Sequence, residues 1–264
     1  MASPTFDRQF KLVTSYLVSP VVLAGIRLLI GLYVLVGLVF MLVWEGTKTK
    51  DIDSFFSYFT NLTYIGICAY FFASGVQTLF YARNLKNGQE EYPLQSWPRF
   101  LRYLHRLLLT TIVTYPLLVT IVYWVLLSSS STFATPFSAW SNISKHALNS
   151  VYAIFEIVFT NVEPMPWVDL PATIVILCGY LGVAYITHAT QGIYTYSFLD
   201  PKKQGKKLAA YIVGIAVGQV IIFLIVFGVV RLRQRLTARG SSTEVEHEKL
   251  RGSVEKNETN NEPA

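Results

Sequence analysis

The stretch PVVLAGIRLLIGLYVLVGLVFMLVW, from Pro20 to Trp44, decides the fold. Arg27 is its one charged residue, and the stretch exceeds the about 20 apolar residues with which a helix crosses a bilayer. Further apolar segments follow at 55–81, 105–127, 144–162, 166–191 and 208–230. Because backbone groups inside a bilayer must bond to one another, the sequence predicts an all-α polytopic membrane protein, a bundle of six transmembrane helices.

The composition supports a membrane protein and argues against other classes. Of the 264 residues, 52% are hydrophobic and only 14% are charged, against about 25% in a soluble domain. The net charge is +6, but the basic residues form short clusters between apolar runs, which suits anionic lipid headgroups and makes nucleic acid an unexpected partner. Cys68 and Cys178 both lie inside apolar runs, so no disulfide framework is expected.

The chain divides into three parts. A cytoplasmic N-terminal segment (1–19) precedes the membrane domain (20–230), and a charged tail (231–264) is predicted to be disordered in the cytoplasm. Lysine and arginine are more frequent in the segments that share a side with the N-terminus, which favours cytoplasmic termini. The expected location is an endomembrane, such as the endoplasmic reticulum, or the plasma membrane, and the oligomeric state stays open.

The fourth apolar segment carries polar residues at helical spacing. Steps of 4, 3, 7 and 4 residues place them on one helix face: Asn142, His146, Asn149, Glu156 and Thr160. Such a stripe must face the bundle interior or a wet cavity. Two interpretations remain: hydrogen bonding between helices, with Arg27 and Glu156 as a structural ion pair, or a functional site.

Depth in the bilayer brings three polar residues to one level. Thr60 near the start of the second segment, His146 in the fourth and His188 near the end of the fifth should lie within a turn or two of each other, whereas Glu156 lies about 15 Å deeper. A threonine hydroxyl within a span usually bonds its own helix. Beside a histidine, however, it forms the minimum for nucleophilic catalysis.

Two asparagines and two histidines complete the predicted polar site. Asn142 or Asn149 would orient the imidazole or stabilise an oxyanion. No metal is predicted, because His146, His188 and Glu156 include no pair four residues apart on one helix, and the chemistry requires no cofactor.

Three stretches resemble one protein family. They are Tyr58-Phe59-Thr60, the pattern from Trp140 through Asn142 and His146 to Glu156, and the pattern His188-x-x-x-Gly192-x-x-x-Tyr196-x-Phe198. Their order and positions are similar to those of the androgen-induced gene and androgen-dependent TFPI-regulating protein family of six-span membrane proteins. The likeness covers roughly 20–230, and Ile143 stands where vertebrate members place a second histidine.

This resemblance implies an activity. Members of the family are threonine hydrolases within the bilayer that cleave fatty acid esters of hydroxy fatty acids. The threonine that opens the second span is their nucleophile and the histidine of the fourth span is its partner, which implies Thr60 and His146 here. A membrane lipid ester is then the expected substrate, with Asn142, Asn149, Glu156 and His188 as supporting groups.

Two other functions remain open on the sequence. A transporter or carrier would use the polar stripe from His146 down to Glu156, near the middle of the bilayer. The chain has no inverted repeat, which counts against a carrier. A membrane protein that only binds lipid is the third hypothesis.

Overall fold

The computed structural model describes residues 6–50 and 52–259, with side chains as far as Ala238. Throughout this described part, every regular element is helical, so the predicted all-α class is confirmed. The α-helices are α1 (Pro20–Trp44), α2 (Phe59–Lys86), α3 (Arg99–Val122), α4 (Pro136–Ile143), α5 (Asn149–Phe159), α6 (Asp169–Gln191), α7 (Pro201–Gln204) and α8 (Lys207–Thr259).

Five helical stretches of the described chain are long and apolar enough to cross a membrane. They are Pro20–Thr49, Phe59–Lys86, Arg99–Leu127, Asp169–Gln191 and Lys207–Ala238. These stretches correspond to the first, second, third, fifth and sixth predicted segments. The chain is therefore a candidate multi-pass membrane protein, and the fourth predicted segment needs separate treatment.

The fourth predicted segment has different limits from those expected. Its helix starts at Pro136, eight residues before the predicted start at 144, because Thr135 forms an N-terminal cap. The Thr135 hydroxyl accepts from the Ser138 amide, and the Ser138 hydroxyl accepts from the Thr135 amide, each at 3.0 Å. A π-helical turn, Ser144–Leu148, joins α4 to α5. The helix ends at Phe159, where Thr160 turns to extended backbone.

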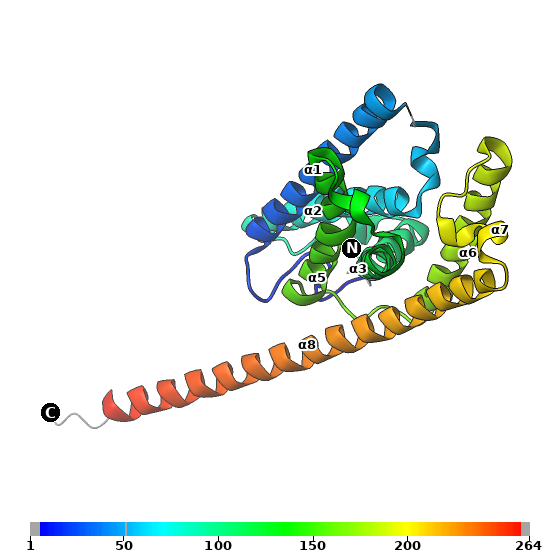
Figure 1. The fold of residues 1–264 in the computed structure, drawn as a ribbon. Coiled ribbons are helices and arrows are strands. Elements are labelled where there is room, and N and C mark those ends of the chain that lie inside the picture. The colour runs from blue at the N-terminus through cyan, green and yellow to red at the C-terminus, as the bar shows by residue number, and fades with distance from the viewer. Residues whose placement is uncertain (1–5, 51, 260–264) are drawn as a thin grey trace.

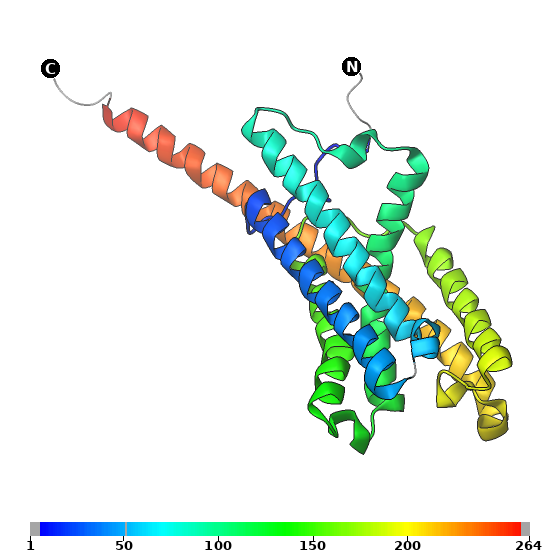
Figure 2. The same ribbon diagram turned by 90° about the horizontal axis from the view of Figure 1, so that it is seen from above.

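Helices α1, α2, α3, α5 and α8 share one apolar core. Figures 1 and 2 show α1 and α2 side by side, with α6 and α7 at the opposite side of the bundle and α8 running from α7 past α3 and α5. Helix α6 buries few side chains, namely Asp169, Thr173, Ala184 and Thr187. Its remaining surface is largely apolar and available to lipid.

Helix α8 holds the end of α5 in place. The last carbonyl groups of a helix have no partner inside it. Here the guanidinium of Arg233 donates to the carbonyls of Ile157, at 2.7 Å, and of Val162. Arg233 is buried, so α8 remains part of the bundle beyond Val230, where the sequence places the start of a disordered tail. Most of that tail (239–264) lies outside the residues whose side chains are described.

Replacing Arg233 by alanine should lower the free energy of unfolding by about 1.5–3 kcal/mol, the range for hydrogen bonds to a charged group. The measurement is unfolding by SDS in mixed micelles, followed by tryptophan fluorescence. Arg235, two residues further along α8, is exposed and serves as the matched control, with an expected change below about 0.5 kcal/mol. Equal losses in the two variants would contradict the role given to the Arg233 contacts.

Candidate active site

Thr60 lies in the first turn of α2, where the chain changes from extended backbone to helix at Tyr58. Its side chain is buried, and because α2 begins at Phe59, no helical carbonyl lies three or four residues before Thr60 to accept from its hydroxyl. The Thr60 hydroxyl and the Thr60 amide each lie 3.3 Å from the hydroxyl of Tyr196. Thr63, in contrast, donates to the Thr60 carbonyl at 2.9 Å and so has the ordinary structural role.

Tyr196 reaches Thr60 because the chain reverses after α6. Gly192 ends that helix in the left-handed region, with φ of 74°, and its amide donates to the His188 carbonyl at 2.9 Å. The returning segment then places Tyr196 against Phe198, with parallel rings 5.2 Å apart, and edge-on to Tyr58. Burial raises the pKa of Tyr196, so its hydroxyl stays protonated and able to donate.

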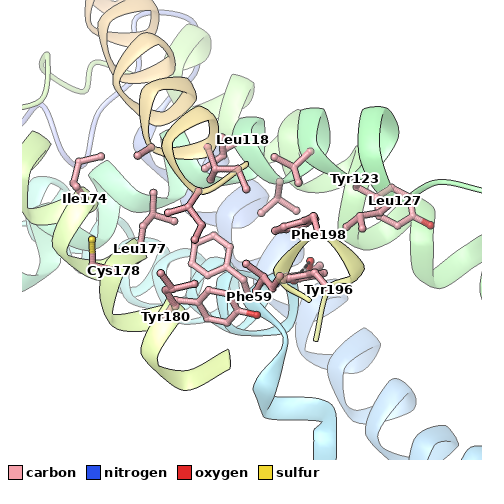
Figure 3. A pocket seen from close by; sticks show the side chains of 18 residues that line it. Phe59, Leu118, Tyr123, Leu127, Ile174, Leu177, Cys178, Tyr180, Tyr196 and Phe198 are labelled. Carbon is pink, nitrogen blue, oxygen red and sulfur yellow. Dashed lines mark hydrogen bonds between the residues drawn. The ribbon is translucent and has the colours of Figure 1, made fainter. Parts of the chain in front are cut away.

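Thr60 and Tyr196 line an apolar cavity of about 110 Å³ between α2, α3, α6 and α8. Figure 3 shows its side chains, from Ile174 and Cys178 at one end to Tyr123 and Leu127 at the other. Nearly all of the lining is aliphatic or aromatic. An apolar cavity with a few converging hydroxyl groups is typical of a site that binds an apolar ligand and orients one polar group of it.

His146 is buried in the π-helical turn Ser144–Leu148. Its imidazole stacks face to face on Tyr123, with ring centroids 3.5 Å apart and planes at 4°. Tyr123 starts a second π-helical turn, Tyr123–Leu127, and lines the cavity, whereas His146 does not. The Nδ1 atom of His146 is buried and has no hydrogen-bond partner in the described structure. Single π-helical turns inside α-helices occur frequently at functional sites.

Contacts between sequence neighbours of Thr60, His146 and His188 link the three segments that carry these residues. Lys145 Nζ donates to Asn61 Oδ1 at 3.3 Å, which ties the fourth segment to the start of α2. The Thr187 hydroxyl donates to the Ser57 hydroxyl at 2.9 Å, which ties the end of α6 to the same region. Among the described side chains, however, no hydrogen bond joins Thr60 to His146 directly.

The supporting asparagines do not reach the imidazole. Asn142 donates to the Thr132 carbonyl at 3.1 Å. The Asn149 side-chain oxygen accepts from the Thr120 hydroxyl at 3.1 Å and from the Ser150 amide at 2.7 Å. Neither asparagine lines the cavity. Both are engaged in joining helices and loops, which is the structural interpretation of the polar stripe.

His188 and Glu156 lie apart from the cavity as well. His188 stacks on Tyr194, with centroids 3.8 Å apart, and its Nδ1 atom is buried without a partner in the described structure. Glu156 is fully buried and forms an ion pair with Arg27, in which two nitrogens of the guanidinium reach the two carboxylate oxygens at 2.8 and 2.7 Å. Tyr70 also donates to this carboxylate, at 3.2 Å. The structural ion pair predicted for Arg27 and Glu156 is therefore confirmed.

Sequence reasoning assigned no role to the tyrosines of the site. Tyr123, Tyr180 and Tyr196 all line the cavity, and the Tyr180 hydroxyl donates to the Ser57 carbonyl at 3.0 Å. Tyrosine is common throughout this chain, so spacing alone does not separate these three from the rest. In the described residues, no group of three or more histidine, cysteine, aspartate or glutamate side chains has the arrangement of a metal site.

Comparison of the chain with protein-family models, with curated proteins and with solved structures found no match.

Proposed function

We propose that this protein is an integral membrane hydrolase of lipid esters, with Thr60 as the nucleophile and His146 as the general base. One observation carries the proposal: the Thr60 hydroxyl lies at the wall of an apolar cavity, in contact with the hydroxyl of Tyr196. An acyl chain fits such a lining, and its ester carbonyl would then meet the hydroxyl of Thr60.

The proposed reaction proceeds in two steps. The Thr60 oxygen attacks the ester carbonyl carbon while His146 accepts the hydroxyl proton; the bond to the alcohol oxygen then breaks, and the alcohol leaves with that proton. Water attacks the acyl-threonine, His146 takes a proton from the water and returns it to Thr60, and the fatty acid departs. The resemblance to the threonine hydrolase family supports the same two residues.

The reaction requires His146 to come into contact with the cavity. Tyr123, which lines the cavity, covers one face of the imidazole. The Tyr123 hydroxyl is held by a single hydrogen bond of 3.3 Å, to Thr132, and the ring is only half-buried. In the proposed mechanism Tyr123 turns aside when substrate enters, and the unpartnered imidazole then approaches Thr60.

The proposed topology has six spans. The helix from Pro136 to Phe159 would be the fourth, because its one buried carboxylate, Glu156, is paired with Arg27 inside the bundle. Both termini would then lie in the cytoplasm, in an endomembrane or the plasma membrane. The substrate would enter sideways from the bilayer past α6, most of whose surface is exposed and apolar.

The carrier hypothesis receives less support than the hydrolase proposal. A carrier that uses Glu156 needs a carboxylate able to exchange its partner, but Arg27 and Tyr70 already bind both oxygens of this carboxylate. A protein that only binds lipid would use the same cavity, with the Thr60 and Tyr196 hydroxyls holding a polar group of the lipid. The following experiment separates these functions.

A lipophilic fluorophosphonate should label the purified protein in micelles at Thr60, because an activated hydroxyl displaces fluoride from phosphorus. We expect Thr60→Ala to abolish labelling and His146→Ala to slow it strongly. Mass spectrometry of the labelled peptide identifies the residue. Thr63→Ala is the matched control, one turn away in α2, and should label normally. Absence of labelling in folded wild-type protein, or labelling that survives Thr60→Ala, would contradict the hydrolase proposal.

A further inference from the structure

The amide of Thr60 has no acceptor within its helix. The first N–H groups of any α-helix lack intrahelical partners. In α2, the amides of Asn61 and Leu62 both donate to the Tyr58 carbonyl, at 3.0 and 3.2 Å. The Thr60 amide instead donates to the Tyr196 hydroxyl. The residue proposed as nucleophile therefore carries a helix-terminal donor beside its own hydroxyl, and the only partner of that donor among the described residues is Tyr196.

We propose that Tyr196 is a further catalytic residue, whose hydroxyl and the Thr60 amide together bind the oxyanion formed during ester hydrolysis. This inference rests on the proposed function and adds to it the group that stabilises the tetrahedral intermediate. When the Thr60 oxygen bonds to the ester carbon, the electron pair of the C=O bond moves to the carbonyl oxygen. That oxygen needs hydrogen-bond donors until the alcohol leaves.

The positions of both donors suit this role. The Tyr196 hydroxyl lies at 3.3 Å from both the amide and the side-chain oxygen of Thr60, which is longer than the 2.7–2.8 Å typical of an O–H···O bond. The tyrosine is therefore weakly engaged and can turn its proton to a stronger acceptor. Serine hydrolases likewise use the amide of the nucleophilic residue as one oxyanion donor.

Other polar groups nearby have committed their protons elsewhere. The Tyr180 hydroxyl donates to the Ser57 carbonyl at 3.0 Å and contacts the Thr195 hydroxyl at 3.2 Å. The Tyr196 hydroxyl contacts two hydroxyl oxygens, those of Thr60 and Tyr180, and its proton can point to either of them. The asparagines predicted for oxyanion stabilisation lie outside the cavity wall. Tyr196 is thus the side chain best placed to donate at Thr60.

The test uses the full-length protein in micelles with 4-nitrophenyl octanoate. Tyr196→Phe keeps the aromatic ring and its packing on Phe198, so KM should stay unchanged while kcat falls by about 100-fold. Tyr185→Phe is the matched control. This substitution also removes a hydroxyl that donates to the same segment, at the Leu199 carbonyl (3.4 Å), but Tyr185 does not line the cavity. Its kcat should remain within about threefold of wild type.

A transition-state analogue separates catalysis from structure. An alkyl trifluoromethyl ketone adds the Thr60 oxygen to its carbonyl carbon and forms an oxyanion, whereas the corresponding carbinol cannot. We expect Tyr196→Phe to lower the affinity for the ketone by about the same factor as it lowers kcat, and to leave the affinity for the carbinol unchanged. If Tyr196 had only a structural role, the variant would lose affinity for both compounds alike, and that result would overturn the proposal.

The remaining outcomes also decide the question. If Tyr196→Phe keeps kcat and ketone affinity within about threefold of wild type while Thr60→Ala is inactive, the oxyanion role falls and the hydrolase proposal stands. If wild type is no faster than Thr60→Ala, both proposals fall. Should Tyr196→Phe fail to fold, 3,5-difluorotyrosine at position 196 replaces it. The more acidic hydroxyl should tighten ketone binding, and unchanged affinity would overturn the role of Tyr196.

Discussion

Replacing Thr60 by alanine should lower turnover of a lipid ester by about 10³-fold or more, because the variant has no oxygen to form the acyl-enzyme. The measurement is kcat/KM in micelles, with products separated by liquid chromatography. Thr60 lies at a helix start and its hydroxyl makes only long contacts, so the variant should fold and keep a melting temperature close to that of wild type. The loss of activity then reflects the missing nucleophile rather than unfolding of the protein.

Two further threonine variants make this result specific. Thr60→Ser retains the hydroxyl and should keep a measurable fraction of the activity, since the nucleophilic oxygen remains. Thr63→Ala removes the neighbouring hydroxyl, which bonds the Thr60 carbonyl, and should cost little activity. If Thr60→Ala and Thr60→Ser both keep wild-type activity, the nucleophile lies elsewhere.

The sequence predicts the five candidate spanning helices well because hydropathy is a local property. Each of the five confirmed helices is long and apolar enough to be recognised without knowledge of its neighbours. The fourth segment differs, since its buried polar residues lower its hydropathy and are tolerated only through partners elsewhere, such as Arg27 for Glu156. Arg27 and Glu156 are 129 positions apart in the chain, so their contact becomes evident only from the tertiary structure.

The common level of the candidate residues follows from counting along helices, but their contacts do not. Counting assumed a regular α-helix from Asn142 to Thr160, whereas a π-helical turn at Ser144–Leu148 interrupts it. The turn shifts Asn142, which is half-buried, relative to the later positions, whereas His146, Asn149, Glu156 and Thr160 are all buried, as the spacing predicts. The contact between Thr60 and Tyr196 depends on the chain reversal after Gly192, which joins residues 136 positions apart. Neither feature has a periodic signal in the sequence.

Changing Glu156 to glutamine should destabilise the protein by about 3–5 kcal/mol, because Arg27 would then be a buried charge without a counterion. Both side chains are fully buried. Arg27 would keep its bonds to the Leu12 carbonyl, at 2.8 Å, and to the Thr78 hydroxyl, at 2.7 Å, and could still donate to the one amide oxygen at position 156. The acceptors in these bonds are neutral, so they do not offset the charge of Arg27. Unfolding by SDS, compared with wild type under the same conditions, measures the loss.

The double replacement Arg27→Met with Glu156→Leu removes both charges and should recover much of the lost stability, since apolar residues of similar size often replace a buried ion pair without cost. A double variant as unstable as Glu156→Gln would show that packing, rather than the unpaired charge, causes the loss.

The same variants also distinguish the hydrolase from the carrier. A hydrolase centred on Thr60 should keep its kcat per folded molecule in the double variant, because the ion pair lies outside the cavity wall. A carrier that depends on Glu156 would lose its activity entirely even when the fold is restored.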